Sequence, residues 1–302
     1  MGVSRCEPAY RPLHRPEQVI LGAGRTGLRP ARRIHSTVFL LSRCVRFAVG
    51  AVPPGPDSRN GYAGRPAMAG LGAHYELSVR CRGDVDPTLG YMIDIQEIDR
   101  AVRAAAIPRI RAAFDEHPAS DPGMLLSQIM PHLAAELRGL LDSVIWRLSP
   151  YYSVEVRMGA LESVLVRQRF DFAAAHRLNV ESLSPDENLR LFGKCNYPGG
   201  HGHNYQVEPC IAAPLGAHGA AIPLSALESL VHAVIIERFD HRNLNQDVEE
   251  FRPPRGVNPS VENIARVCHR LLAPEVARTF PGAELRSVTV WESDRTSSTF
   301  PA

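Results

Sequence analysis

The chain of 302 residues contains a single lysine, Lys194, so nearly all of its 34 basic side chains are arginines. The formal net charge is only +2, because 32 acidic residues offset the basic ones. A protein that binds nucleic acid over a broad surface carries a clear excess of positive charge. The sequence therefore gives no indication of a nucleic-acid partner.

Long hydrophobic runs and paired cysteines are also missing. The most apolar stretch, STVFLLSRCVRFAVGAV, is interrupted by Arg43 and Arg46, whereas a membrane-spanning helix needs about 18 apolar residues in a row. The six cysteines form no CxxC pair, which in a chain of this size is typical of reduced, intracellular proteins. We expect a cytoplasmic protein with no membrane partner.

The first 36 residues are rich in arginine, poor in acidic residues and broken by four prolines. Three interpretations fit this composition: a disordered tail, an organelle transit peptide, or a start codon assigned too far upstream. We favour the tail or the misassigned start, and treat residues 1–36 as an extension of the folded part.

The rest of the chain contains an internal repeat, which is the first feature to seek because it decides the fold. GLGAHYELSVRCRG (70–83) resembles GHGHNYQVEPCIAA (200–213), with Leu71 and Ala73 at the positions of His201 and His203. Three more pairs of segments match in the same order: VRFAVGA (45–51) with FDFAAAH (170–176), FDEH (114–117) with FDHR (239–242), and YSVEVRM (152–158) with RSVTVWE (286–292). We therefore predict two tandem copies, over residues 37–160 and 161–302.

Each copy shows the same order of elements. In the second copy, apolar residues recur at helical spacing behind Pro223 and again over 261–272, and LRSVTVWES alternates as a final strand. The first copy has matching helical patterns over 95–102 and 126–140. Two strands, two helices and closing strands predict an α+β fold, in which each copy has its helices on one face of an antiparallel sheet.

Three histidines of the second copy suggest a metal site. His201 and His203 stand two apart, so on a strand they leave the same face, and Gly200 and Gly202 let the backbone approach a ligand closely. His176 completes the set if its strand pairs antiparallel with theirs. Catalytic zinc takes three protein ligands and keeps a fourth position open. An isolated HxH is also compatible with ordinary polar strand residues.

Other residue types for catalysis lie close by in the sequence. Cys195, six positions before His201, would have its thiolate favoured beside a dication and could serve as base or nucleophile. A fourth ligand in a closed structural zinc site and an unreactive thiol are the alternatives. Asp240 can orient His241 for proton transfer, although an Asp-His pair is also common at a helix end.

Two further polar residues are candidates for substrate binding. Glu292 can accept two hydrogen bonds from the amidine-like edge of a ring, or be an ordinary solvated carboxylate. Ser260 follows a proline and precedes an apolar-periodic run, so it is first a helix N-cap and second a ligand.

Five ordered segments between residues 169 and 300 together resemble the 6-pyruvoyltetrahydropterin synthase family, which includes the bacterial 6-carboxytetrahydropterin synthases. The segments are FDFAAAHRL, ENLRLFGKCNYPGGHGHNY, FDHRNLNQDVEEF, NPSVENIA and VTVWES. The resemblance implies tandem tunnelling-fold units, each a four-stranded antiparallel sheet with two helices on one face, which assemble around a barrel. It also implies homo-oligomers with active sites at subunit interfaces.

The resemblance also implies a role for each matching residue. His176, His201 and His203 would hold Zn²⁺, Cys195 would be the general base, Asp240 and His241 the proton relay, Glu292 the pterin anchor, and Ser260 with Glu262 part of the pterin pocket. Many members carry a hydroxyl residue after that serine, where this chain has Val261.

The implied reaction converts 7,8-dihydroneopterin triphosphate to 6-pyruvoyltetrahydropterin with loss of triphosphate. One alternative is the sister activity, which cleaves the side chain to give 6-carboxytetrahydropterin for deazapurine (queuosine) synthesis. The five residues between Cys195 and His201 favour the pyruvoyl type. A second alternative, a zinc-stabilised pterin-binding module, has no need of the acid-base set.

The first copy lacks these groups and is not expected to catalyse. The corresponding positions are Ala51, Leu71 and Ala73 for the zinc ligands, Glu116 for the relay histidine and Met158 for the pterin glutamate. Our hypothesis is that this copy is a scaffold that replaces alternate subunits of a ring, giving a trimer of two-unit chains rather than a hexamer.

Overall fold

The computed structural model describes residues 38–50, 71–217, 219–220 and 222–302. The predicted extension over 1–36 and the predicted counterpart of a zinc ligand, Ala51, lie outside these ranges. Within them, no helix combines the length and the apolar character needed to cross a membrane. The five cysteines they contain are all free thiols.

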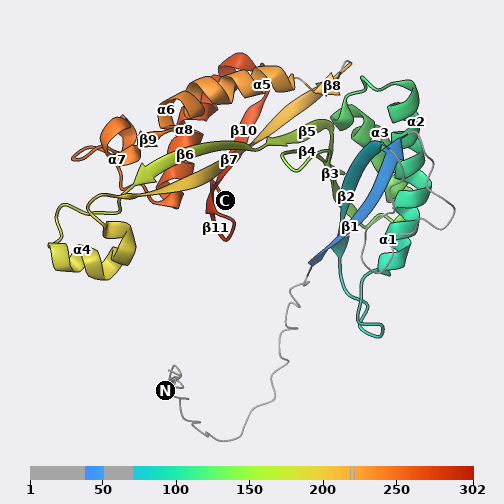
Figure 1. The fold of residues 1–302 in the computed structure, drawn as a ribbon. Helices are drawn as coiled ribbons and strands as arrows, with labels where there is room; N and C mark the ends of the chain where they lie inside the picture. The colour runs from blue at the N-terminus through green and yellow to red at the C-terminus, as the bar shows by residue number, and fades with distance from the viewer. Residues whose placement is uncertain (1–37, 51–70, 218, 221) are drawn as a thin grey trace, which may run out of the picture. The chain divides into compact units, whose positions relative to one another are not determined.

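The first half of the described chain is a four-stranded antiparallel sheet with two helical runs (Figure 1). The first run passes through a π-helical segment, η1, between α1 and α2. The strands are β1 (Phe39–Gly50), β2 (Gly72–Gly83), β3 (Leu141–Arg147) and β4 (Tyr152–Arg157). The helical segments are α1 (Ile95–Ala101), η1 (Val102–Ala106), α2 (Ile107–Glu116) and α3 (Pro122–Glu136).

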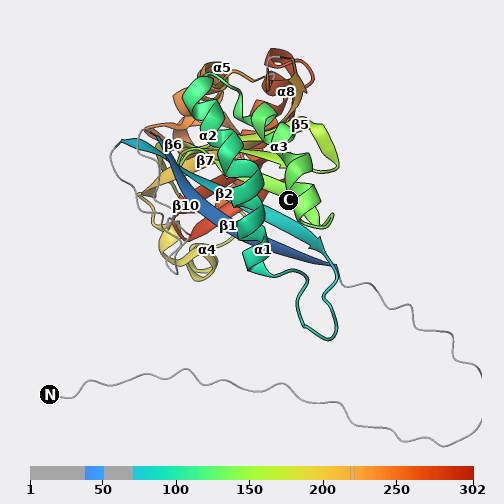
Figure 2. The same ribbon diagram turned by 90° about the vertical axis from the view of Figure 1, so that its right-hand side faces the viewer.

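Local sequence explains where these elements begin and what they bury. Asp94 and Asp121 each accept a hydrogen bond from a backbone N–H of the first turn that follows, which is the usual N-cap arrangement. Burial alternates along β1 and β2, as a period of two requires for a sheet with one covered face. Figure 2 shows α1 and α2 lying across that face in front of β1 and β2.

The second half repeats this order. Its first strand is split at Arg169 into β5 and β6, and both parts pair with β7. The strands are β5 (Ala160–Gln168), β6 (Phe170–His176), β7 (His201–Gly216), β10 (Glu284–Ser293) and β11 (Thr296–Phe300), with the short β8 (Gly219–Ala220) and β9 (Arg242–Asn243) beside them. The main helical segments are α5 (Leu224–Val231), the π-helical η3 (His232–Ile236), α6 (Glu237–Phe239) and α8 (Val261–Thr279). The smaller ones are α4 (Pro185–Phe192), η2 (Gly193–Asn196), α7 (Leu244–Asp247) and η4 (Glu249–Phe251).

The two halves share one sheet. β4 pairs with β5 and β5 with β7, so the main path runs β1-β2-β3-β4-β5-β7-β10-β11. The predicted boundary at residue 160 falls at the β4–β5 turn, where Arg157 pairs with Ala160. The prediction of an α+β fold with four-stranded antiparallel sheets and two main helical runs per half is confirmed.

Strand register gives the two halves a common geometry. Phe47 pairs with Tyr75 on β1 and β2, and Phe172 pairs with Tyr205 on β6 and β7. The alignment of the two repeats matched Phe47 with Phe172 and Tyr75 with Tyr205, so equivalent residues form equivalent pairs in the two halves. In each half a π-helical segment interrupts the first helical run. Both observations support the interpretation of the halves as tandem copies.

Two details of the predicted repeat are wrong. The segment RSVTVWE lies on β10, which pairs with β7. In the first half, the strand that pairs in the same way with β2 is β3. The counterpart of RSVTVWE is therefore β3 and not the YSVEVRM segment on β4. By this register, Leu148 rather than Met158 corresponds to Glu292. The strand LRSVTVWES is also not the last one, because β11 follows and pairs with it. β11, TSSTF, has no apolar alternation to mark it as a strand.

Candidate active site

The three predicted histidines meet at the end of the β6–β7 pair. The antiparallel register places His176 opposite His201 and Ala174 opposite His203. Their potential ligand atoms all lie within 4.8 Å of one another, and Nε2 of His176 is 3.1 Å from Nε2 of His201. The arrangement is the hairpin that the sequence analysis required for a three-histidine site.

A glycine makes this close approach possible. Gly200 has a φ of +71°, a left-handed conformation that favours glycine, and a Cβ there would lie 3.0 Å from the carbonyl oxygen of His176. A Cβ at Gly202 would have ordinary contacts only. Of the two glycines singled out in the sequence, Gly200 is therefore the one that the geometry needs.

A backbone carbonyl fixes the orientation of His176. The imidazole is fully buried, and its Nδ1 lies 2.7 Å from the carbonyl oxygen of Pro259, just before α8. A carbonyl only accepts, so Nδ1 carries the proton and Nε2 presents a lone pair to the other histidines. Metal-binding histidines usually have such a second partner. Sequence reasoning missed Pro259, because its oxygen belongs to the backbone of a distant segment.

The electrostatics of the cluster favour neutral imidazoles. Burial lowers the pKa of His176, with the Pro259 hydrogen bond opposing and the neighbouring His201 adding to the effect. Burial also lowers the pKa of His201, and His203 contributes further. A neutral imidazole is the form that binds metal ions.

Glu292 completes the cluster. Its Oε1 lies 3.3 Å from Nε2 of His176 and 3.6 Å from Nε2 of His203. The Nε2 atom of His203 is buried and has no hydrogen-bond partner among the described residues. The ring nitrogens of the three histidines therefore converge beside one carboxylate oxygen. This donor set fits a divalent cation such as zinc, which takes nitrogen and oxygen ligands.

Cys195 is held next to the strand that carries His176. Helix α4 begins with a capping box at Ser184 and ends at Gly193, whose φ of +52° lets the chain turn into η2. The carbonyl oxygen of Cys195 then accepts a hydrogen bond from the backbone N–H of Leu178, at 2.8 Å. The thiol is half-buried and free.

Tyr205 packs against the histidines. Burial, followed by the charge of Glu292, raises the pKa of Tyr205 well above its usual range. The same ring lies 6.0 Å from His176 and 5.5 Å from His203, centroid to centroid. Tyr205 was not among the predicted site residues, although its match to Tyr75 in the repeat singled it out.

Asp240 and His241 form a hydrogen-bonded pair next to β6. Asp240 accepts a hydrogen bond from the backbone N–H of Ala173 at 2.8 Å, and its other oxygen lies 2.8 Å from Nδ1 of His241. The Ala173 hydrogen bond, and next to it His241, hold the pKa of Asp240 below its ordinary value. His241 has a φ of +56° and a side chain that is 83% exposed. His203 and His241 line one open pocket, so the pair neighbours the histidine cluster while pointing largely to solvent.

The two residues predicted for the pterin pocket wall both lie at the start of α8. Ser260 caps α8, with its hydroxyl accepting a hydrogen bond from the backbone N–H of Asn263, so the N-cap interpretation is confirmed. Glu262 is exposed in the first turn of the same helix. Ser260 directly follows Pro259, whose carbonyl oxygen lies 2.7 Å from Nδ1 of His176.

In the described part of the first half, the positions that correspond to His201 and His203 carry apolar side chains. Leu71 is 93% exposed, and Ala73 pairs with Val49 where His203 pairs with Ala174. Glu116 ends α2, and Leu148 occupies the position of Glu292. Among the residues that the structure describes, the histidine cluster of the second half is the one candidate metal site of three or more ligands.

An α+β chain with a three-histidine site and a nearby cysteine defines a class of candidate metalloenzyme, and comparison with known proteins specifies it. Residues 165–302 match the family model described as 6-pyruvoyl tetrahydropterin synthase. The 6-pyruvoyl tetrahydrobiopterin synthase of Homo sapiens is 37% identical over 130 residues, which are 43% of this chain and 85% of that protein. The chain therefore belongs to the 6-pyruvoyl tetrahydropterin synthase family.

Two more similar proteins are a second sequence relative and a solved structure. The 6-pyruvoyl tetrahydrobiopterin synthase of Drosophila melanogaster is 45% identical over 99 residues, 32% of this chain and 57% of that protein. The structure of Caenorhabditis elegans 6-pyruvoyl tetrahydropterin synthase is 32% identical, with a TM-score of 0.42, and covers 46% of this chain and 94% of that one. The resemblance stated from the sequence and the prediction of an enzyme of this type are confirmed.

Proposed function

We propose that the chain is a zinc-dependent lyase that converts 7,8-dihydroneopterin triphosphate to 6-pyruvoyltetrahydropterin with loss of triphosphate. The observation that carries the proposal is the convergence of three histidine nitrogens and the Glu292 carboxylate beside the Cys195 loop, in a chain of this family. The proposed cofactor is Zn²⁺, held by His176, His201 and His203. Bound there, zinc would act as a Lewis acid that lowers the pKa of the substrate's side-chain hydroxyls.

The residues of the chain supply the proton transfers. Cys195, as thiolate, would accept a proton from a side-chain carbon of the substrate. The Asp240–His241 pair would return one, with the contact between Asp240 and Nδ1 of His241 orienting the imidazole. The exposure of His241 is consistent with a role across a subunit interface, where a second copy would cover it.

Glu292 would orient the substrate. A carboxylate can accept two parallel hydrogen bonds from the amino group and ring N–H of a pterin. Glu292 lies on β10, next to β7, at the edge of the histidine cluster. We propose that it fixes the ring while the side chain of the substrate reaches the histidines, with Ser260 and Glu262 in the wall of the pterin pocket.

The sister reaction, which yields 6-carboxytetrahydropterin, is the alternative that the same groups could perform. The five residues between Cys195 and His201, folded as the end of η2 and a turn, favour the pyruvoyl product. The metal site and the cysteine are common to both proposals, so only product analysis separates them.

The first half would serve as a scaffold for assembly. β1 and β11 end the main path of the sheet and present unpaired backbone groups, which is the property that lets strands of separate chains join. We propose a ring of three two-unit chains. Light scattering should give a trimer, and a fully active monomer would contradict the proposal.

The function is tested by incubating the zinc-loaded full chain with 7,8-dihydroneopterin triphosphate and identifying products by mass spectrometry. We expect a pyruvoyl product and free triphosphate, both lost in Cys195→Ala. The matched control is Cys44→Ala, which removes another half-buried free thiol, on β1. A 6-carboxy product would shift the assignment to the sister reaction, and tight pterin binding without turnover would favour the binding module.

A further inference from the structure

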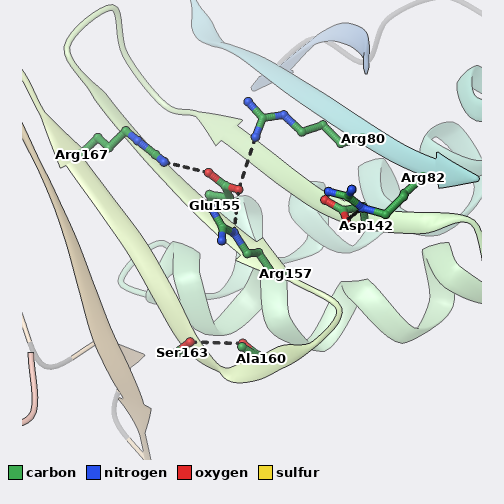
Figure 3. A network of polar contacts seen from close by, with 8 residues as sticks. All are labelled: Arg80, Arg82, Asp142, Glu155, Arg157, Ala160, Ser163 and Arg167. Carbon is green, nitrogen blue, oxygen red and sulfur yellow. Dashed lines mark hydrogen bonds and ion pairs between the residues drawn. The ribbon is translucent and has the colours of Figure 1, made fainter. Parts of the chain in front are cut away.

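A second cluster of charged residues lies on the sheet away from the histidines, around Glu155 of β4. Its neighbours Val154 and Val156 point into the core, so Glu155 points to the opposite face. The Glu155 side chain is nevertheless 0% exposed, because arginines from neighbouring strands cover it. Figure 3 shows three guanidinium groups directed at this one carboxylate.

The contacts use both carboxylate oxygens. Oε1 lies 3.5 Å from Nη1 of Arg80 and 3.2 Å from Nε of Arg157, and Oε2 lies 2.9 Å from Nη2 of Arg167. The cluster ties β2, β4 and β5 together at the junction of the two halves of the sheet. A structural role of this kind explains why Glu155 has arginine partners, but not why three arginines surround a single carboxylate.

The arginines are only partly compensated. Each guanidinium has five N–H donors, and Nη1 of Arg167 is buried without a hydrogen-bond partner among the described residues. A buried donor left unsatisfied costs about 1–3 kcal/mol, so it is a position where a missing acceptor is expected.

Arg167 also lines a pocket of about 440 Å³, a size in the range of small-molecule sites. Arg286 also lines the pocket, and its guanidinium lies 3.1 Å from the exposed carboxylate of Glu284. Four guanidinium groups pair with the two carboxylates of Glu155 and Glu284: those of Arg157, Arg167 and Arg286 in the pocket wall, and that of Arg80, which contacts Glu155 but is not among the residues that line the pocket. Two positive charges therefore remain uncompensated, and the Ser287 hydroxyl adds a further possible donor to the wall.

We propose that this pocket binds a phosphate-class oxyanion, held by Arg157, Arg167 and Arg286. A phosphate group carries close to two negative charges at neutral pH, which matches the uncompensated charge. Guanidinium groups bind phosphate through paired hydrogen bonds, more specifically than lysine does. The proposal does not depend on the proposed function. Cys210 in the pocket wall lies seven residues along β7 from His203, roughly 23 Å of extended strand.

The test is calorimetric titration of the zinc-loaded full chain with inorganic phosphate, and separately with inorganic tripolyphosphate. We expect Arg167→Gln to weaken phosphate binding about 10-fold or more, the effect of one charged hydrogen bond. Arg286→Gln should weaken phosphate binding several-fold and leaves the contacts of Glu155 intact. This variant therefore still tests the proposal if Arg167→Gln fails to fold. The matched control is Arg82→Gln, whose guanidinium pairs with Asp142 outside the pocket (Figure 3) and which should bind phosphate like the wild type.

The two titrants identify the source of the phosphate group. A ligand with several phosphates is supported if tripolyphosphate binds much more tightly than phosphate and Arg286→Gln reduces both affinities by the same factor. Equal affinities support a single phosphate. Absence of phosphate binding at about 10 mM, or unchanged affinity in both pocket variants, overturns the proposal.

Discussion

His176 donates its Nδ1–H to the carbonyl oxygen of Pro259, at 2.7 Å, and thereby turns its Nε2 lone pair toward His201 and His203. The contact joins the end of β6 to the start of α8, two segments that are 83 residues apart in the sequence. Helix α8 thus positions a candidate metal ligand without contributing one itself. The integrity of the site should therefore depend on how this helix begins.

Ser260→Ala tests this dependence. Loss of the N-cap should lower the free energy of unfolding by about 1 kcal/mol, and a less fixed Pro259 carbonyl should weaken zinc binding about 10-fold. Ser260→Asp, which retains a capping oxygen, is expected to restore both. Urea denaturation and zinc competition with a chromogenic chelator measure the two effects. If Ser260→Asp restored stability and zinc affinity but raised KM strongly, Ser260 would contact the substrate directly.

Acid should destabilise the metal-free protein through the histidine cluster. The pKa values of His176 and His201 are lowered in the folded chain, so below the ordinary histidine pKa of about 6.5 the unfolded chain binds protons more readily. The free energy of unfolding must then decrease as the pH falls through about 6.5 toward the folded-state values. Thermal denaturation in a chelator between about pH 7.5 and pH 5.5 should show a falling Tm, with a shallower fall in His201→Gln. An equal slope in wild type and variant would refute this.

The cluster around Glu155 should be important for stability. Glu155→Gln removes the negative charge beneath three guanidinium groups, and we expect a loss of about 3 kcal/mol in the free energy of unfolding. Asp142→Asn breaks the partly exposed Arg82–Asp142 pair and should cost less than about 1 kcal/mol. Urea denaturation of both variants measures the difference. Equal costs would mean that burial of Glu155 has no energetic consequence.

The Asp240–His241 pair should affect turnover rather than folding. Asp240→Asn keeps an amide oxygen to accept the Ala173 hydrogen bond, but removes the carboxylate oxygen that contacts Nδ1 of His241 and orients its ring. We expect kcat to fall about 100-fold, with unchanged zinc content and Tm. Asp186→Asn, in the exposed first turn of α4, is the control. Wild-type kcat in Asp240→Asn would remove the pair from the proposed proton transfers.

The sequence predicted those features of fold and site that depend on local pattern. Period-two alternation located β6 and β7, and with it the pairing that brings His176 to His201. Contacts that depend on tertiary structure left no local signal, as with the carbonyl of Pro259. β11 escaped prediction because its residues are polar, and the pairing of β10 had to be known before Leu148 could be matched to Glu292.

The most direct test of this account is the zinc content of the purified full chain after dialysis, measured by elemental analysis. The account predicts one zinc per chain, because the second half holds three histidines where the first half has Leu71 and Ala73. His203→Ala should lose the metal, while His74→Ala, an exposed strand histidine of the first half, should keep it. Two zinc ions per chain, or one that persists in His203→Ala, would contradict the assignment of a single metal site to this cluster.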